Sequence, residues 1–386
     1  TLENASVTGG DDVGLVAGTS NGTVQNVTVS GSVTGDTRVG GLVGTTESGS
    51  TITDSSAAVP TSGSERVGGL VGSHQDGPIR NVTATGDVLT EGGKVGGLVG
   101  YTQASVTNAS ASGEVTTSGQ EVGGLVGQLE AHSNEEVRGV KATGNVSAGS
   151  SYVGGLIGFV DQDSGFDEVT MSDAHATGDV NTTNSGGNAR VGGLVGRFKE
   201  SRHLTNVSAT GDVTSATGNY VGGLVGRLQM ENGNQVVSNA SATGDVTTSG
   251  IYVGGLIGNH EDGRRIRNAT ATGDVSTTGD YVGGLVGNTR ASITNASASG
   301  EVTTNGQRVG GLVGYLDAHS NEEVRNVTAT GNVSAGSYYV GGLIGFVDQN
   351  SGFDEVTMSD AHATGDVNTT YSGSGNAHVG GLVGRF

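Results

Sequence analysis

The sequence predicts an all-β fold, a β-solenoid in which one short unit is repeated along a single continuous region, residues 1–386. Three observations carry this prediction. The string Val-Gly-Gly-Leu-(Val/Ile)-Gly occurs twelve times, its copies are mostly 27 to 32 residues apart, and each copy is followed by a stretch of alternating apolar and polar residues. No window has the length or the Ala, Leu and Glu content that favours a helix.

The first half of each unit is this glycine-bounded string. A thirteenth, altered copy at residues 13–18 precedes the twelve full ones, so the sequence predicts about 13 rungs of 27 to 39 residues each. Strict alternation along a strand would place Leu42 and Val43 on opposite faces. A bulge at Gly40 and Gly41 would instead turn the leucine and the valine inward together. The leucines of the full copies are Leu42, Leu70, Leu98, Leu125, Leu156, Leu194, Leu224, Leu256, Leu285, Leu312, Leu343 and Leu382.

The second half of each unit is clearest at residues 79–88. Alternation places the apolar or small residues Val82, Ala84, Gly86 and Val88 on one side of a strand and polar residues on the other, the pattern of a half-buried strand. Two short strands per unit with small inward residues suit a narrow solenoid. At the inter-strand spacing of about 4.8 Å, such rungs would form a rod roughly 60 Å long.

A longer repeat lies over the short one. Residues 98–198 recur almost unchanged as residues 285–386, so the chain is expected to contain two six-rung super-repeats and no separate catalytic domain. Because a duplication copies every residue, the recurrence of a polar cluster is weak support for a role of that cluster.

The composition excludes several classes of protein. The formal net charge is −20, with 38 acidic against 18 basic residues, which disfavours nucleic acid as a partner because phosphate backbones are bound by basic surfaces. The chain has no cysteine and therefore neither disulfides nor thiolate metal sites. No window is apolar enough for membrane insertion of this stretch.

The string around Leu42, read as Gly-Leu-Val-Gly, resembles the GLUG repeat, a Gly-Leu-any-Gly motif found in tandem in large secreted and surface proteins of bacteria and archaea. The resemblance covers essentially the whole chain. It implies an extracellular, secreted or cell-surface β-solenoid that acts as a structural or adhesive rod, and it carries no catalytic residues. The acidic balance, with three lysines against fifteen arginines, is similar to that of proteins adapted to high salt and points to a halophilic archaeon.

Asn-X-Ser/Thr sequons are frequent and mark candidate sites for N-linked glycan in an exported protein. Four of them lie away from the common repeat position and are the stronger candidates: Asn145, Asn181, Asn332 and Asn368. Most of the others share one repeat position, where stacked asparagines would instead bond to the backbone of neighbouring rungs. These weaker candidates are Asn26, Asn81, Asn108, Asn206, Asn239, Asn268, Asn295 and Asn326.

Two copies of an acidic segment suggest calcium, the one cofactor that the sequence indicates. Each copy has carboxylate or amide oxygens at alternate positions around a glycine, and Ca²⁺ prefers such oxygen ligands. The competing interpretation is a solvated acidic loop, because the full spacing of an EF-hand loop is missing. The candidate ligands are Asp161, Asp163 and Asp167 in the first copy, and Asp348, Asn350 and Asp354 in the second.

Other functions have weaker support. Outward Thr-X-Thr pairs, such as Thr83 with Thr85, resemble the ladders of ice-binding solenoids, so a solenoid that binds ice or glycan is the alternative class. A polysaccharide-degrading solenoid would need a pair of unlike carboxylates in a cleft. The sequence contains no His-Glu-X-X-His, nucleophile elbow or phosphate loop, and we therefore expect no enzyme.

The chain begins with a second half-unit and stops after a first half-unit, so its end followed by its beginning reads as one internal unit. We therefore expect head-to-tail continuation, either through a longer repeat chain or through stacking of separate copies into a filament. A cell surface or a glycan is the other partner that the resemblance suggests.

One repeat position on the polar side is acidic in most units, and the like charges should stack about one rung apart. Repulsion between them would be relieved by screening salt or by bridging cations, so folding should depend on ionic strength or divalent cations. Thermal melts in low salt, in molar salt and in millimolar calcium test this, and identical melting in all three would contradict it. The residues concerned are Asp87, Glu114, Asp179, Asp212, Asp245, Asp274, Glu301 and Asp366.

Overall fold

A computed structural model describes residues 1–149, 151–162, 169–183, 187–199, 201–229, 236–261, 265–319, 321–336, 338–349, 355–371 and 376–386. Every regular element in these ranges is a β-strand. The chain forms two compact units. Unit 1 is Thr1–Thr183 with Leu194–Glu200, and unit 2 is Asn184–Gly193 with Ser201–Phe386. Within the described ranges, no helix is long and apolar enough to cross a membrane.

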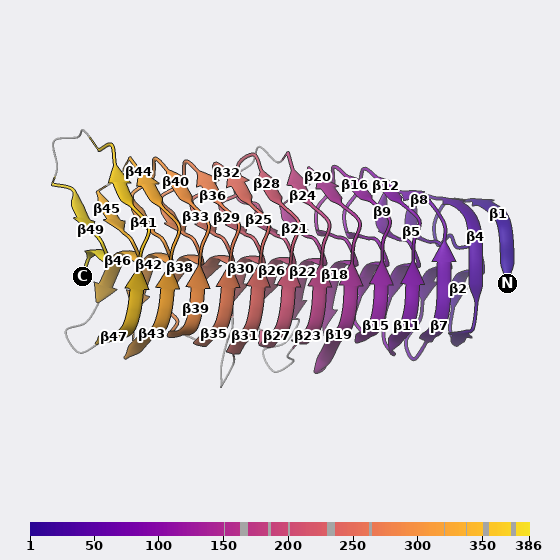
Figure 1. Ribbon diagram of the computed structural model, residues 1–386. Helices are drawn as coiled ribbons and strands as arrows, with labels where there is room; N and C mark the ends of the chain where they lie inside the picture. The colour runs from indigo at the N-terminus through magenta and orange to yellow at the C-terminus, as the bar shows by residue number, and fades with distance from the viewer. Residues whose placement is uncertain are drawn as a thin grey trace. The chain divides into compact units, whose positions relative to one another are not determined.

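The predicted β-solenoid is confirmed. Each complete turn contains four strands, of which two contribute to sheet A and one each to sheets B and C, and equivalent strands of successive turns pair in parallel. Within each unit, Figure 1 shows these equivalent strands side by side, turn after turn. The two halves of the sequence unit are thus each divided into two strands, where the sequence predicted one strand per half.

In unit 1, sheet B consists of β5 (Thr37–Gly40), β9 (Glu65–Gly68), β13 (Val95–Gly96), β17 (Val122–Gly123) and β21 (Tyr152–Gly154). Sheet C consists of β2 (Ala17–Ser20), β6 (Val43–Thr46), β10 (Val71–His74), β14 (Val99–Thr102), β18 (Val126–Ala131), β22 (Ile157–Gln162) and β26 (Val195–Lys199). Sheet A consists of β1 (Leu2–Thr8), β3 (Thr23–Gln25), β4 (Thr28–Thr34), β7 (Thr51–Ala58), β8 (Thr61–Gly63), β11 (Ile79–Ala84), β12 (Val88–Thr90), β15 (Val106–Ala111), β16 (Val115–Thr117), β19 (Glu135–Ala142), β20 (Val146–Ala148), β23 (Val169–Ala176) and β24 (Val180–Thr182).

In unit 2, sheet B consists of β25 (Arg190–Gly192), β29 (Tyr220–Gly222), β33 (Tyr252–Gly254), β37 (Tyr281–Gly283), β41 (Arg308–Gly310), β45 (Tyr339–Gly341) and β49 (His378–Gly380). Sheet C consists of β30 (Val225–Gln229), β34 (Ile257–His260), β38 (Val286–Thr289), β42 (Val313–Ala318), β46 (Ile344–Gln349) and β50 (Val383–Arg385). Sheet A consists of β27 (Ser201–Ala209), β28 (Val213–Ser215), β31 (Val236–Ala242), β32 (Val246–Thr248), β35 (Arg265–Ala271), β36 (Val275–Thr277), β39 (Ile293–Ala298), β40 (Val302–Thr304), β43 (Glu322–Ala329), β44 (Val333–Ala335), β47 (Val356–Ala363) and β48 (Val367–Thr369).

The solenoid has about 11 turns, so the prediction of about 13 rungs was slightly too high. The difference arises at the first and the last copy of the motif. Val13, in the altered first copy of the motif, forms only an isolated bridge to Val39. Strand β4 pairs with β1 on one side and with both β7 and β8 on the other, so it takes the place of two strands. The altered first copy of the motif therefore does not form a complete four-strand turn, and the copy at Leu382 contributes only β49 (His378–Gly380) and β50 (Val383–Arg385).

Sheet A confirms the predicted alternation. In β11, Val82 and Ala84 are buried, whereas Asn81 is exposed and Thr83 is half-buried. Identical positions of neighbouring turns pair, as Ala84 does with Ala111, so that each inward residue stacks on its equivalent. Equivalent inward residues stack directly on one another. Small and β-branched side chains therefore fill the narrow interior.

The Gly-Gly-Leu segment forms a corner between sheets B and C. The expected bulge is absent at the first full copy, since β5 ends at Gly40, β6 begins at Val43, and the alternation restarts in a different sheet. Leu42 and Val43 are consequently both fully buried. The carbonyl oxygen of Leu70 in the next turn accepts hydrogen bonds from the Leu42 N–H at 2.8 Å and from the Val43 N–H at 3.2 Å.

Glycine is required at this corner because the backbones of successive turns approach closely. A Cβ atom on Gly97 would lie 2.2 Å from the carbonyl oxygen of Gly124 and 3.1 Å from the Cβ of Ala111. Such contacts with backbone cannot be relieved by moving a flexible side chain. The same carbonyl contact recurs at Gly69, Gly124 and Gly255.

We predict that Gly97→Val lowers the free energy of unfolding by about 3 kcal/mol, the upper end of the cost of overpacking. The matched control is Gly381→Val, because nothing lies within 4 Å of a Cβ placed at this equivalent glycine. Chemical denaturation monitored by circular dichroism measures both variants. Equal stability of Gly97→Val and Gly381→Val would contradict the role assigned to the corner.

Candidate functional site: polar columns on the outward faces

The acidic residues predicted to stack do form a column on sheet A, and they also bond to the backbone. In unit 1 the Glu114 N–H donates to Asp87 Oδ1 at 2.9 Å. In unit 2 the Asp274 N–H donates to Asp245 Oδ1 at 2.8 Å, and the Glu301 N–H donates to Asp274 Oδ1 at 2.7 Å. Asp87, Asp245 and Asp274 thus each accept a hydrogen bond from the backbone of the next turn, and a charged acceptor strengthens such a bond.

Asparagine replaces the acid at two positions of this column and makes the same contact. Asn145 Oδ1 accepts from the Asp179 N–H at 2.9 Å, and Asn332 Oδ1 accepts from the Asp366 N–H at 2.9 Å. An uncharged side-chain oxygen therefore meets the structural requirement. The negative charge of the other members is an additional property of the surface.

The weaker sequon candidates form a different column, an asparagine ladder at a bend in sheet A. Asn81, Asn108 and their equivalents have φ between 50° and 55°, a left-handed conformation that asparagine tolerates better than most residues. The Asn108 Nδ2 donates to Asn81 Oδ1 at 3.3 Å, and the Asn326 Nδ2 donates to Asn295 Oδ1 at 2.8 Å. The described ladder contacts join side chain to side chain, whereas the sequence suggested contacts from side chain to backbone.

Some turns have no asparagine at this bend, and other residues that tolerate a positive φ replace it. Asp54, Asp173 and Asp360 have φ of 51°, 51° and 49°, and Gly139 has φ of 62°. Asp54 accepts hydrogen bonds from Asn81 Nδ2 at 2.9 Å and from Gln25 Nε2 at 3.1 Å. The bond from Asn81 is the main cause that holds the pKa of the Asp54 carboxyl below its usual value.

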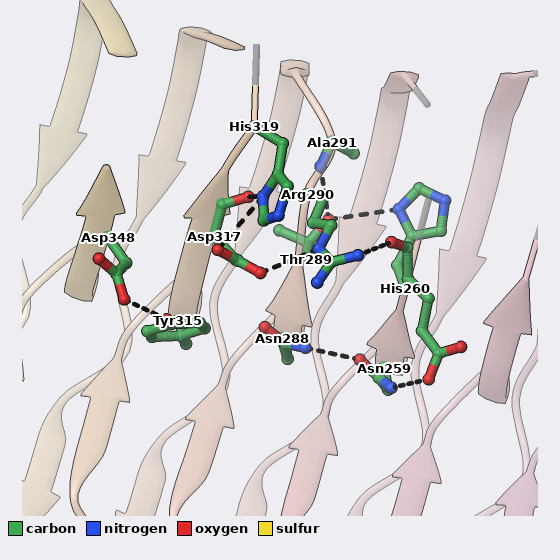
Figure 2. A network of polar contacts seen from close by, with 11 residues as sticks. Asn259, His260, Asn288, Thr289, Arg290, Ala291, Tyr315, Asp317, His319 and Asp348 are labelled. Atoms are coloured by element: carbon green, nitrogen blue, oxygen red, sulfur yellow. Dashed lines mark hydrogen bonds and ion pairs between the residues drawn. The ribbon is translucent and has the colours of Figure 1, made fainter. Parts of the chain in front are cut away.

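A polar network runs along sheet C of unit 2, and Figure 2 shows it across β34, β38, β42 and β46. Arg227 binds Glu261 through two hydrogen bonds of 2.9 and 2.7 Å. Glu261 also accepts from Asn259 Nδ2 at 2.9 Å, and Asn259 Oδ1 accepts from Asn288 Nδ2 at 2.8 Å. These contacts link three successive turns.

The network continues on the following turns through an ion pair and further polar contacts (Figure 2). Arg290 lies 2.9 Å from the buried carboxylate of Asp317, whose other oxygen lies 3.3 Å from His319 Nδ1. The Tyr315 hydroxyl donates to Asp348 at 2.6 Å. Burial is the main cause that raises the pKa of Tyr315, and the hydrogen bond to Asp348 raises it further.

Aromatic rings and guanidinium groups stack where sheets B and C meet. The ring centroids of Tyr220 and Tyr252 are 5.1 Å apart, and those of Tyr252 and Tyr281 are 4.7 Å apart. The Arg308 guanidinium carbon lies 4.8 Å from the Tyr281 centroid and 5.3 Å from that of Tyr315. The faces of these rings are thus in contact with neighbouring rings or guanidinium groups of the same chain.

The calcium prediction falls largely outside the described residues. Asp163, Asp167, Asn350 and Asp354 lie there. Of the described ligands, Asp161 accepts from Lys199 Nζ at 2.9 Å and Asp348 accepts from Tyr315. In the described ranges, no group of three or more His, Asp or Glu side chains is arranged to hold a metal ion. Calcium binding therefore stays a prediction.

Among the described residues, two hydroxyl–imidazole pairs are both buried. Thr46 donates to His74 Nδ1 at 2.6 Å, and the imidazole donates from Nε2 to the Gly77 carbonyl at 2.7 Å. The second pair joins Thr289 to His260 Nδ1 at 3.2 Å. All four side chains have zero exposure, so a substrate would not reach them. Burial lowers the pKa of His74, which keeps its ring neutral.

An open depression of about 400 Å³ lies in unit 1 and is the place to look for an acidic cleft. Asp76 and Glu135 both line it. Ser105 donates to Glu135 Oε2 at 2.5 Å and Ser133 donates to Glu135 Oε1 at 2.6 Å. These contacts fix Glu135 in place.

Two features were missed in the sequence although their signals were present. Tyrosine precedes Val-Gly-Gly at Tyr152, Tyr220, Tyr252, Tyr281 and Tyr339, and this recurrence alone predicts an aromatic column. The restriction of one repeat position to Asn, Asp or Gly is likewise the signature of a positive φ.

The chain matches the GLUG motif at residues 35–61, 63–89, 91–116, 249–276, 278–303 and 305–334. It is similar to Halomucin of Haloquadratum walsbyi (strain DSM 16790 / HBSQ001), with 58% identity over 268 residues. That alignment covers 69% of this chain and 3% of Halomucin, so the chain spans a very small part of that relative. No solved structure matches the chain.

We predict that charge and hydrogen bonding in the acidic column can be separated. Asp245→Asn keeps the oxygen that accepts from Asp274, whereas Asp245→Ala removes it. In low salt, Asp245→Asn should melt at or above the wild-type temperature, and Asp245→Ala should lose about 0.5–1.5 kcal/mol of stability, the net contribution of one hydrogen bond. Thermal melts at several salt concentrations measure both. Equal destabilisation of the two variants would show that the charge itself holds the column.

Proposed function

We propose that this run of GLUG-motif repeats is a non-enzymatic structural segment of a long extracellular surface protein adapted to concentrated salt. The single observation that carries the proposal is the columnar surface. At the bend of sheet A, asparagine repeats turn after turn and bonds to its own equivalent, and in the acidic column a side-chain oxygen bonds to the backbone of the next turn. The polar groups of such a surface bond to neighbouring turns and so hold the turns together.

The similarity to Halomucin supports an extracellular location and a role as one segment among many. This chain corresponds to 3% of that relative, and a segment built of equivalent turns can be repeated to any length. The name and source of the relative also agree with an origin in a salt-loving archaeon. The acidic columns, whose charge the fold does not require, would keep the surface hydrated in brine.

Adhesion and catalysis receive less support from the described geometry. The aromatic rings that would bind a sugar face are stacked on each other or on guanidinium groups. The hydroxyl–imidazole pairs are buried. A structural role does not require the aromatic rings or the hydroxyl–imidazole pairs to be accessible. It therefore agrees with their engaged or buried positions.

Antibodies raised against this chain test the location directly. Applied to cells of the source organism, they should label intact cells as strongly as permeabilised ones. Labelling that appears only after permeabilisation would contradict an extracellular segment. In parallel, the chain in molar salt should neither bind a panel of immobilised polysaccharides at micromolar concentration nor release reducing ends from them. Saturable binding or product release would replace the structural role with an adhesive or enzymatic one.

A further inference from the structure

The sequon asparagines differ in which side-chain atom, Nδ2 or Oδ1, makes the described hydrogen bonds. In the asparagine ladder the amide nitrogens are engaged, since Asn268 Nδ2 donates to Asn239 at 3.1 Å and Asn295 Nδ2 donates to Asn268 at 3.2 Å. Asn81 Nδ2 similarly donates to Asp54 at 2.9 Å. These nitrogens lie on one bend of the sheet, one rung apart.

Asn145 and Asn332 are held in a different way. Their Oδ1 atoms accept the backbone N–H of Asp179 and Asp366, each at 2.9 Å, so the side chains are fixed through oxygen. Both residues are exposed. The contacts that the structure describes for these two side chains do not involve Nδ2, the atom to which an N-linked glycan is attached.

Their neighbours along the column leave room for a bulky group. Asn145 is preceded by Glu114 and followed by Asp179 in the adjacent turns, and Asn332 by Glu301 and Asp366. None of these four can carry an N-glycan. Asn145 and Asn332 are themselves far apart in the sequence.

The ladder offers no such room. Successive ladder asparagines are one inter-strand spacing apart, about 4.8 Å, and a pyranose ring with its equatorial substituents is wider than this. Glycans on neighbouring ladder residues would collide. A single glycan there would also have to share its nitrogen with the bond to the next turn.

We propose that Asn145 and Asn332 are N-glycan acceptors of this solenoid and that the ladder asparagines remain unmodified. In the transfer, Nδ2 forms a bond to C1 of the sugar, and the C1–O bond to the phosphate of a lipid-linked oligosaccharide breaks. The proton leaves Nδ2 for a base of the transferase, and the lipid phosphate is the leaving group. The proposal rests on the export assumed in the proposed function.

The test expresses the full chain behind an export signal in a halophilic host whose own secreted glycoproteins carry N-glycans, with one of these as an internal standard. Glycopeptide mass spectrometry should find glycan on Asn145 and Asn332. Asn145→Asp and Asn332→Asp should each remove one glycan. Both should fold, because aspartate accepts the same backbone bond at Asp245.

The matched controls are Asn108→Asp and Asn295→Asp, since Asp54 shows that aspartate fits the ladder bend. These variants should keep both glycans. Glycan on a ladder asparagine, or unmodified Asn145 and Asn332 beside a modified standard, would overturn the proposal. Because the export signal is supplied, a secreted but unmodified chain refutes only the acceptor sites, and the antibody labelling decides the location separately.

Discussion

The close approach of backbone to backbone at the Gly-Gly-Leu corner is the constraint on which the rest of the structure depends. Each corner carbonyl accepts two N–H groups from the neighbouring turn, as that of Leu125 does from Leu98 at 2.9 Å and Val99 at 3.0 Å. This geometry leaves no space for a Cβ on the glycine before the leucine. The corner therefore sets both the spacing of the turns and the direction in which the chain enters sheet C.

Once the turns are in register, the surface chemistry follows from repetition. Every outward side chain meets its equivalent one turn away, so residues that can bond to their own kind or to the next backbone are favoured. Asparagine does the first at the bend of sheet A, and aspartate or asparagine does the second beside it. The aromatic column uses ring stacking in the same way. The acidic charge is the one outward property that the contacts do not require.

Much of the fold could be predicted from the sequence, because the inward pattern of Val82, Ala84 and Val88 depends only on local alternation. The sequence suggested a bulge at Gly40 and Gly41 and did not show the corner between two sheets, since alternation within a strand carries no information on which sheet comes next. The turn count was overestimated because a copy of the motif, such as the one at Val13, does not by itself guarantee four strands.

The candidate sites were harder to predict because contacts between turns decide which side-chain atoms are engaged. The preference for Asn145, Asn181, Asn332 and Asn368 over the ladder sequons came from their different repeat position. For Asn145 and Asn332 the structure adds a physical difference from the ladder, which is the side-chain atom that is bonded. The network of Arg290 with Asp317 joins residues on different turns, and nothing in the local sequence marks them as partners.

Hydrogen exchange at single-residue resolution tests the role of the corner most directly. The amides of Leu98 and Val99, which both donate to the Leu125 carbonyl, should exchange only as fast as the whole unit unfolds. The exposed turn amides of Ser48 and Gly49 in the same unit provide the fast reference. Slow exchange at every corner pair would support the account, and corner amides that exchange as fast as those of Ser48 and Gly49 would contradict it.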